Sequence, residues 1–326
     1  MMSKLYLVTG GTGFLGSALV RHLLQRGHRV RVLDNDWRGS IRRLKDIQSE
    51  FEFVATDIRD AEAVTKATEG VDSICHLAFV NGTKFFYTQP EFVLDVGVKG
   101  TVNVIDACLK HGVGELILAS SSEVYQTPPS VPTDEAVPLS IPDILNPRYS
   151  YAAGKIIGEA MALNYGRRHF QRVVVFRPHN VYGPDMGWEH VIPQFALRMK
   201  QLCQIAGDPV RFPIQGSGKE TRAFAFIEDF IAGLGLVLEH GEHLGIYNIG
   251  TREEVTVEEL AHLVGDYFGR KLEVVPGEPT EGGTLRRCPD IAKLTALGYK
   301  PQYNLHKGLP IALRWYDENA HLKPAE

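Results

Sequence analysis

Short runs of apolar and β-branched residues recur along the first half of the chain, and helix-period stretches such as 14–25 and 98–110 separate them. The short runs are typical of buried strands, and the longer stretches are typical of amphipathic helices. This alternation predicts βαβ units and a parallel sheet with helices on both faces. The expected strands are Leu5–Val8, Val30–Leu33, Phe51–Val54, Ser73–His76, Leu116–Ala119 and Val173–Phe176.

The pattern changes at two places. Residues 126–148 contain six prolines, which predicts an extended loop. After about Pro178 the alternation loosens, although "YNIGT" at Tyr247 indicates one more strand. Thr256 and Glu259 have the spacing of a capping box, so we expect a helix from there to Phe268.

Composition narrows the functional classes. The 326 residues are 44% apolar, enough for a large core, and 35 basic against 39 acidic residues indicate neither nucleic-acid nor membrane binding. No apolar run approaches a membrane span or a signal peptide, so we expect a cytoplasmic protein. The four cysteines are widely spaced, and we predict no disulfide framework and no metal site.

A glycine-rich turn joins the first strand to the first helix. Gly10, Gly13 and Gly16 would let backbone N–H groups approach a pyrophosphate at the helix N-terminus. Asp34 ends the second strand, where a carboxylate accepts hydrogen bonds from a ribose 2′-hydroxyl and repels a 2′-phosphate. The pair predicts NAD in preference to NADP, although the nearby Arg38 weakens that preference a little.

These features predict an α/β protein with a Rossmann-type, doubly wound parallel sheet and a smaller C-terminal α/β lobe that binds substrate. The sheet domain is expected at 1–178 with a returning segment at about 224–250, and the lobe at 179–223 and 251–326.

Polar residues that suit proton transfer follow the fifth strand. The segment "ASSSEVYQ" puts Ser121, Ser122 and Glu123 at a strand carboxyl end, where such sheets bind ligands. Further on, "YSYAAGK" places Tyr151 and Lys155 one helical turn apart. An ammonium group beside a phenol stabilises the phenolate, so we expect Tyr151 to take a proton from a substrate hydroxyl while hydride leaves to nicotinamide.

The chain resembles the sugar-nucleotide epimerase/dehydratase branch of the extended short-chain dehydrogenase/reductase superfamily. The resemblance rests on the GxxGxxG spacing and on motifs along the whole chain. "HLAF" at His76 resembles the family's "HLAA", and "VKGTVNVIDAC" resembles "NVxGTxNxLxAC". The chain departs from the family by having Gly97 in place of an asparagine and Gln126 in place of a glycine after "VY". Further matches are "TDI", "FRPHNVYGP", "GSGKETRAFAFIEDF" and "RRCPDI".

The resemblance implies roles for individual residues. Ser121 matches the serine or threonine that orients the reacting oxygen beside Tyr151 and Lys155. Ser122 and Glu123 are the catalytic residues expected to decide which product forms. The implied cofactor residues also include Phe14, Leu15, Asp57, Ile58, Leu77 and Ala78. The implied substrate residues are Asn180, Arg222 and Arg287, with His179 and His190 as further candidates. "MGWEH" (186–190) has no counterpart in the family's motifs.

The resemblance also implies an enzyme of carbohydrate biosynthesis, which acts on a nucleotide-diphosphate sugar as a homodimer through the helix near 98–111 and the Tyr/Lys helix. Transient oxidation at C4 is common to several reactions. We favour a 4,6-dehydratase with Glu123 as the C5 base. A 4-epimerase, a C3 or C5 epimerase, a uronate decarboxylase, a simple dehydrogenase/reductase and a non-catalytic dinucleotide sensor stay open. Glu123 acting only to hold the proline-rich loop also stays open.

Overall fold

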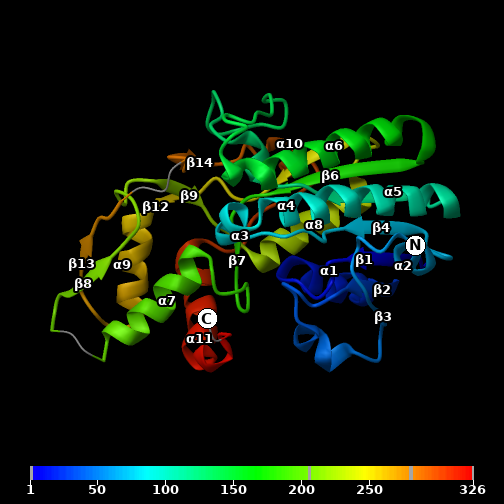
Figure 1. The fold of residues 1–326 in the computed structure, drawn as a ribbon. Helices are drawn as coiled ribbons and strands as arrows, with labels where there is room; N and C mark the ends of the chain where they lie inside the picture. The colour runs from blue at the N-terminus through cyan, green and yellow to red at the C-terminus, as the bar shows by residue number, and fades with distance from the viewer. Residues whose placement is uncertain (1–2, 205–206, 279–281, 325–326) are drawn as a thin grey trace.

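A seven-stranded parallel sheet forms the centre of the computed structural model, which describes residues 3–204, 207–278 and 282–324 (Figure 1). The strand order is β11-β6-β5-β4-β1-β2-β3. The bounds are β1 Leu5–Thr9, β2 Arg29–Asp34, β3 Glu52–Ala55, β4 Ser73–His76, β5 Glu115–Ala119, β6 Arg172–Pro178 and β11 Gly245–Ile249. The order reverses between β1 and β4, as in a doubly wound dinucleotide-binding fold, so the predicted fold class is confirmed.

The sheet separates two apolar cores because successive side chains of a strand point to opposite faces. Leu7 and Val175 belong to one core, whereas their neighbours Val8 and Val174 belong to the other. Strands buried on both faces have nearly continuous apolar sequences, which is why most of the six short runs were recognisable in the sequence; the edge strand β3 is largely exposed.

Helices cover both faces of the sheet (Figure 1). On one side α2 contacts α5, and α5 contacts α6; on the other, α1 contacts α8. Their bounds are α1 Phe14–Gln25, α2 Ala61–Ala67, α5 Gly100–His111, α6 Ser150–His169 and α8 Ile227–His240. Two short helices precede α5, namely α3 Thr83–Thr88 and α4 Pro90–Leu94, and a π-helical turn at Asp95–Lys99 joins α4 to α5.

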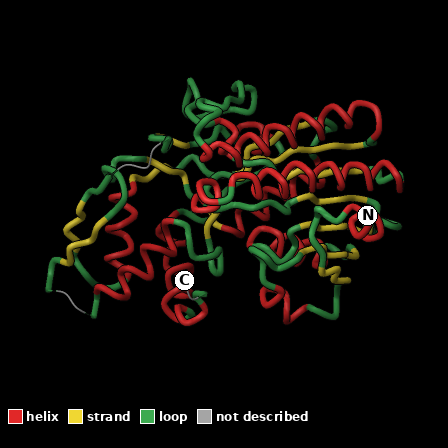
Figure 2. Tube along the Cα trace, in the orientation of Figure 1, coloured by secondary structure: helices red, strands yellow, loops and turns green. Residues whose placement is uncertain are grey.

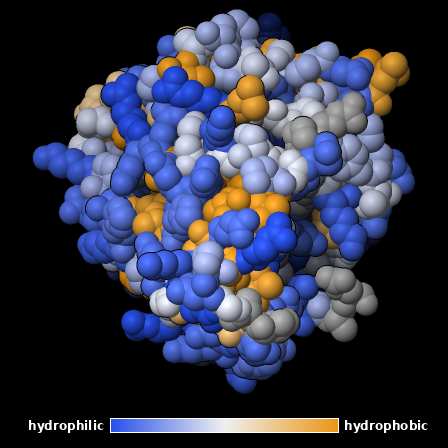
Figure 3. Space-filling view, turned by 90° about the vertical axis from the view of Figure 1, so that its left-hand side faces the viewer, coloured by the Kyte–Doolittle hydropathy of each residue, from blue (hydrophilic) through white to orange (hydrophobic). Residues whose placement is uncertain are grey.

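Short strands and three longer helices make up the C-terminal lobe, beside the carboxyl ends of the central strands (Figure 1). The helices are α7 Val191–Leu202, α9 Val257–Tyr267 and α11 Leu305–Glu318, with the shorter α10 Ala292–Ala296 next to β11. The small sheets are β7 Val181–Tyr182 with β10 Ala225–Phe226, β8 Val210–Pro213 with β13 Leu272–Val275, and β9 Thr221–Ala223 between β12 Glu254–Thr256 and β14 Arg286–Arg287. Seen from this side, the surface is largely hydrophilic around apolar side chains near its centre (Figure 3).

The loop and cap predictions are confirmed. Residues 126–146 contain no helix and form a long loop, whereas the last two residues of the predicted loop, Pro147 and Arg148, begin a short 3-10 turn that ends at Tyr149 (Figure 2). At the start of α9, the Thr256 hydroxyl accepts a hydrogen bond from the Glu259 N–H at 3.0 Å, and the Glu259 carboxylate accepts one from the Thr256 N–H at 2.7 Å. The division into two domains stays an interpretation, although β11 does join the main sheet beside β6.

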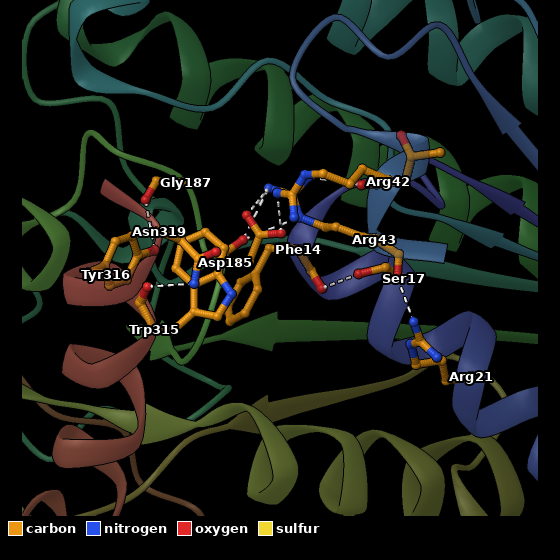
Figure 4. A network of polar contacts seen from close by, with 11 residues as sticks. Phe14, Ser17, Arg21, Arg42, Arg43, Asp185, Gly187, Trp315, Tyr316 and Asn319 are labelled. Carbon is orange, nitrogen blue, oxygen red and sulfur yellow. Dashed lines mark hydrogen bonds and ion pairs between the residues drawn. The ribbon is translucent and has the colours of Figure 1, made fainter. Parts of the chain in front are cut away.

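The segment that follows "YGP" connects the lobe to the loop after β2 (Figure 4). The Asp185 carboxylate accepts hydrogen bonds from Arg42 at 2.6 Å and Arg43 at 3.2 Å. On its other side, the hydroxyl of Tyr316 in α11 donates to the Gly187 carbonyl at 2.8 Å. The unassigned "MGWEH" segment therefore lies between the two parts of the molecule.

None of the helices in the described ranges is long and apolar enough to cross a membrane. The same ranges contain no cluster of three or more His, Cys, Asp or Glu side chains that could hold a metal ion.

Candidate active site

A cleft with a volume of about 120 Å³ opens at the carboxyl ends of β1, β2 and β4. The predicted residues that line it are Gly10, Gly13, Asp34, Asp57, Ile58, Leu77 and Ala78. The glycine turn is tightly packed: a Cβ on Gly10 would lie 2.7 Å from the Ala78 nitrogen, and one on Gly16 would lie 2.1 Å from the Gly10 carbonyl oxygen. Only glycine allows this approach, so the cradle has the shape that a pyrophosphate needs.

Asp34 lies at the mouth of this cleft, as the sequence predicts. Its carboxylate accepts hydrogen bonds from the N–H groups of Thr12 at 3.0 Å and Asp36 at 2.9 Å. Burial raises the pKa of Asp34, and these hydrogen bonds oppose the shift. Arg38 forms an ion pair with Glu189 at 3.1 Å, so its charge is already partly compensated. Both observations favour a ribose hydroxyl over a 2′-phosphate at this position.

Phe14 and Leu15 begin α1, where the first backbone N–H groups of the helix are free to face a phosphate. On the adenine side, the Asp57 carboxylate accepts hydrogen bonds from Arg59 at 2.8 Å and from the Asn35 side chain at 3.0 Å. Seven of the predicted cofactor residues therefore line a single cleft beside the start of α1, and the group that fits this arrangement is a dinucleotide.

The turn after β5 brings the serines and Glu123 together. The Ser121 hydroxyl accepts a hydrogen bond from the Glu123 N–H at 3.1 Å, and this bond starts a short 3-10 turn over Ser122–Tyr125. Ser122 is buried within the turn. Gln126 ends the turn with φ of 50° and donates from its side-chain amide to the Glu123 carbonyl at 2.6 Å. A side-chain hydrogen bond therefore accompanies the unusual backbone at the position where the family has glycine.

Tyr151 and Lys155 lie on one face of α6, buried against the cleft wall. Burial raises the pKa of Tyr151, a hydrogen bond from Ser121 opposes the shift, and the charge of Glu123 reinforces it. The Lys155 ammonium donates to the Ala119 carbonyl at 2.7 Å and lies 5.8 Å from the centroid of the Tyr151 ring. Burial lowers the pKa of Lys155 to about 7. Burial therefore dominates the pKa of Tyr151 in this conformation, and a lowering of that pKa by Lys155 stays a prediction.

Glu123 forms an ion pair with Arg287. The guanidinium of Arg287 donates to the Glu123 carboxylate at 2.6 Å; the Glu123 side chain is 24% exposed and the Arg287 side chain 11% exposed. Burial disfavours the charged carboxylate, but Arg287, Arg148 and Arg222 together outweigh burial and lower the pKa of Glu123. Glu123 is therefore ionised at neutral pH, which is the protonation state that a base requires.

Arg222 and Arg287 lie side by side because β9 and β14 pair in parallel with these two residues in register. Burial and the charge of Arg287 lower the pKa of Arg222 to about 10. Two neighbouring guanidinium groups form a site that an anion would stabilise. The adjacent Arg286 points away and binds Glu254 at 2.7 Å, since successive strand residues face opposite sides.

The remaining predicted substrate residues form hydrogen bonds with other parts of the protein. Asn180 donates from its side chain to the Ala223 carbonyl at 3.3 Å. His179 has no exposed surface, and its ring nitrogen lies 3.1 Å from the side-chain oxygen of Asn248, so the structure does not favour a substrate contact by His179. His190 precedes α7, and burial and the charge of Arg38 lower its pKa.

Several neighbours of the site are absent from the sequence prediction. Thr284 accepts hydrogen bonds from Arg287 through its hydroxyl at 3.0 Å and from Arg222 through its carbonyl at 2.8 Å. Arg148 adds positive charge near Glu123. Phe79 and Phe86 contact the Tyr151 ring, each with a centroid distance of 5.0 Å. Thr284 and Arg148 carry no sequence signal. Phe79 is the last residue of "HLAF" and Phe86 follows it closely in the sequence, so both could have been considered as neighbours of the site.

The fold and the site together are those of a dinucleotide-dependent enzyme of the short-chain dehydrogenase/reductase type. The model of the NAD dependent epimerase/dehydratase family matches residues 6–250. The chain therefore belongs to that family, as the sequence motifs predict.

Relatives within the family catalyse different reactions. The chain is 32% identical to the dTDP-glucose 4,6-dehydratase of Streptomyces antibioticus over 96% of this chain and 92% of the relative. It is 33% identical to UDP-glucuronic acid decarboxylase 6 of Arabidopsis thaliana over 94% of this chain and 86% of the relative.

Solved structures show the same spread of reactions. The dTDP-glucose 4,6-dehydratase DesIV of Streptomyces venezuelae, solved with NAD, has a TM-score of 0.87 and 31% identity over 98% of both chains. The UDP-glucose 4-epimerase of Thermus thermophilus, also solved with NAD, has a TM-score of 0.83 and 30% identity over 96% of this chain and 98% of that one. The protein is therefore an enzyme of a family that acts on nucleotide sugars, and identities near 30% do not select one reaction among them.

Proposed function

We propose that this protein binds NAD and is a 4,6-dehydratase of a nucleotide-diphosphate hexose. The observation that carries the proposal is an ionised, partly buried Glu123, located two residues from Ser121 and close enough to Tyr151 to affect its pKa. A carboxylate at this position can remove a proton from the sugar, which a serine cannot do at neutral pH. NAD, when bound in the glycine-lined cleft, supplies the oxidant for C4 and later returns the hydride.

The substrate diphosphate is assigned to Arg222 and Arg287. Both guanidinium groups are held by the backbone or hydroxyl of Thr284, so they are positioned before an anion arrives. A diphosphate would accept paired hydrogen bonds from such groups. The sugar would then extend toward the turn that carries Ser121 and Glu123.

Tyr151 and Ser121 are assigned to the C4 oxygen. The hydrogen bond from Ser121 to the Tyr151 oxygen already brings these two groups together. Tyr151 takes the hydroxyl proton as the C–H bond at C4 is oxidised, and Ser121 orients the same oxygen. Lys155 supplies the positive charge on this face of α6.

Glu123 is assigned to the elimination. A ketone at C4 makes the C5 proton acidic, and Glu123 removes it. The same carboxyl group then protonates the departing C6 hydroxyl, which leaves as water. Ser122, the neighbouring side chain, has no acidic proton of suitable pKa, so one carboxyl group serves both steps in turn. A diphosphate on Arg287 would weaken the hold of that arginine on Glu123 and raise the basicity of the carboxylate on substrate binding.

A uronate decarboxylase is the second candidate because three arginines, Arg148, Arg222 and Arg287, act on the single carboxylate of Glu123. This excess of positive charge could also bind a C6 carboxylate of the sugar. The relatives include decarboxylases at comparable identity. A 4-epimerase, as in one of the structural relatives, needs no base at position 123.

The deciding experiment incubates the enzyme with nucleotide-diphospho-glucose and nucleotide-diphospho-glucuronate in D₂O, with several bases, and follows products by NMR. Dehydration predicts deuterium at C5 and loss of the 6-hydroxyl. Release of CO₂ from the glucuronate would instead establish decarboxylation, and inversion at C4 without exchange would establish epimerisation. Glu123→Gln should retain C4 oxidation and lose elimination, whereas Tyr151→Phe should lose both. Full turnover by Tyr151→Phe would overturn the assignment of the oxidation step.

We also propose a homodimer through α5 and α6, supported by three partly exposed apolar side chains on these helices, Leu109, Ile157 and Tyr165. Light scattering after gel filtration tests this, and a monomer at micromolar concentration would contradict it. The cytoplasmic location stays a prediction.

A further inference from the structure

Phe79 and Gly97 are two unusual residues of the chain that contact each other in the structure. Phe79 ends the "HLAF" segment, and Gly97 lies in the π-helical turn Asp95–Lys99. A Cβ on Gly97 would lie 2.1 Å from the tip of the Phe79 ring, and a Cβ on Gly154 would lie 2.9 Å from it. The ring therefore fills space that a side chain at position 97 would need, and the two residues have to be considered together.

The Phe79 ring contacts both members of the Tyr/Lys pair. Its centroid is 4.1 Å from the Lys155 ammonium nitrogen, well within the range of a cation–π contact. The edge of the Tyr151 ring meets it at 5.0 Å with an interplanar angle of 78°. Phe86 stacks on Tyr151 at 5.0 Å and 19°. Phe79 also lines the cofactor cleft, so this side chain lies between the cleft and the Tyr/Lys pair.

The other groups that act on the buried ammonium are the Ala119 carbonyl, the charge of Glu159, which favours the charged form, and the nearby His76 ring. Lys155 is 5% exposed and donates to the Ala119 carbonyl at 2.7 Å. Burial alone disfavours the charged form and lowers its pKa to about 7, within the working range of an enzyme. The negative face of an aromatic ring at 4.1 Å acts in the opposite direction, because it attracts the ammonium and not the neutral amine.

We propose that Phe79 is a positioning residue of the reaction, which holds the Lys155 side chain against the Ala119 carbonyl and keeps it charged, and that Gly97 and Gly154 are small in order to admit its ring. The proposal rests on the proposed roles of Tyr151 and Lys155. It assigns a catalytic consequence to a departure from the family pattern that otherwise affects only loop shape.

The test replaces Phe79 in the full-length holoenzyme with phenylalanines that carry one, two and three ring fluorines. Fluorine withdraws electron density from the ring face and changes the shape of the side chain little. Since Lys155 has to be charged for activity, the alkaline limb of kcat/KM should move to lower pH with each fluorine, by about 0.5 to 1 pH unit over the series. The same series at Phe86, which stacks on Tyr151, is the matched control and should leave that limb in place.

An unmoved limb in the Phe79 series, or an equal movement in the Phe86 series, would overturn the proposal. Gly97→Ala gives a second measurement that does not need fluorinated residues. Gly97→Ala alone should lower kcat, because the added methyl group collides with the Phe79 ring. The double variant Phe79→Leu/Gly97→Ala should be more thermally stable than Gly97→Ala, while the alkaline limb of kcat/KM stays at lower pH than in the wild type. Tyr151→Phe separates this proposal from the proposed function. If Tyr151→Phe is inactive and the alkaline limb of kcat/KM does not move in the fluorinated Phe79 series, only the role of Phe79 fails. If it is active, the proposed oxidation step fails.

Discussion

The ion pair between Glu123 and Arg287 makes a quantitative prediction for Arg287→Gln. Glutamine keeps an amide donor near the carboxylate but removes the charge. A hydrogen bond to a charged group contributes about 1.5–3 kcal/mol, and one pKa unit corresponds to about 1.4 kcal/mol. Because Glu123 is 24% exposed and solvent screens the pair, we expect a loss in the lower part of this range, about 1.5 kcal/mol, and a rise in the pKa of Glu123.

The sign of the effect on stability follows from the lowered pKa of Glu123 in the folded state. A carboxyl group with a depressed folded pKa stabilises the protein above its unfolded pKa, and this contribution is lost as pH falls through the folded pKa. The stability difference between wild type and Arg287→Gln should therefore be constant from about pH 6 to 8 and shrink toward pH 4.

The assay is urea unfolding at several pH values, together with carboxyl ¹³C NMR of Glu123, assigned with Glu123→Gln. Arg286→Gln is the matched control, because its guanidinium binds Glu254 and not Glu123. The acidic limb of the pH dependence of kcat/KM should move to higher pH in Arg287→Gln and stay in place in Arg286→Gln. If the Glu123 carboxyl titrates at the same pH in wild type and Arg287→Gln, the reasoning about this ion pair is refuted.

Three further changes test other contacts. Asp185→Asn removes the charge that binds two arginines across the lobes, so the urea midpoint should fall by the equivalent of about 1–2 kcal/mol, and by less in 0.5 M NaCl; a salt-independent loss would contradict this. Gln126→Ala keeps the positive φ but loses the amide hydrogen bond, so the free energy of unfolding should fall by about 1 kcal/mol. Gln126→Gly should be the more stable of the two variants in thermal unfolding, because glycine adopts a positive φ without strain. Glu159→Gln leaves the buried charge of Arg177 without its 2.6 Å ion-pair partner, and calorimetry should show a loss of about 3 kcal/mol; a loss below 1 kcal/mol would show that the pair contributes little.

The parts of the fold that the sequence predicted well are those with a strong local signal. The central strands are apolar on both sides, so their runs were visible without knowledge of their partners. The glycine turn and Asp34 were recognisable for the same reason, since a tight backbone approach admits only glycine. The capping box at Thr256 and Glu259 is likewise a signal contained within four residues.

The parts that the sequence did not predict depend on contacts between distant segments. Arg222 and Arg287 were singled out by motif, but their adjacency arises from the pairing of β9 with β14, 65 residues apart along the chain. Thr284, which holds both, has no pattern of its own. His179 was a reasonable substrate candidate until its burial against Asn248 was known. The relation between Tyr151 and Lys155 was predicted from helical spacing, which cannot report that Lys155 donates to Ala119.

The two departures from the family pattern illustrate how local and distant constraints combine. Gln126 occupies a position whose φ of 50° favours glycine, and a hydrogen bond to Glu123 accompanies this backbone, so the departure acts on the turn that holds the proposed base. Gly97 replaces a larger residue, and the space is filled by Phe79, which contacts Lys155 and Tyr151. Each departure is thus connected to one half of the proposed chemistry, elimination in one case and oxidation in the other. Since neither touches the glycine turn, we expect differences between this enzyme and its relatives to lie in proton transfer, with the mode of cofactor binding shared.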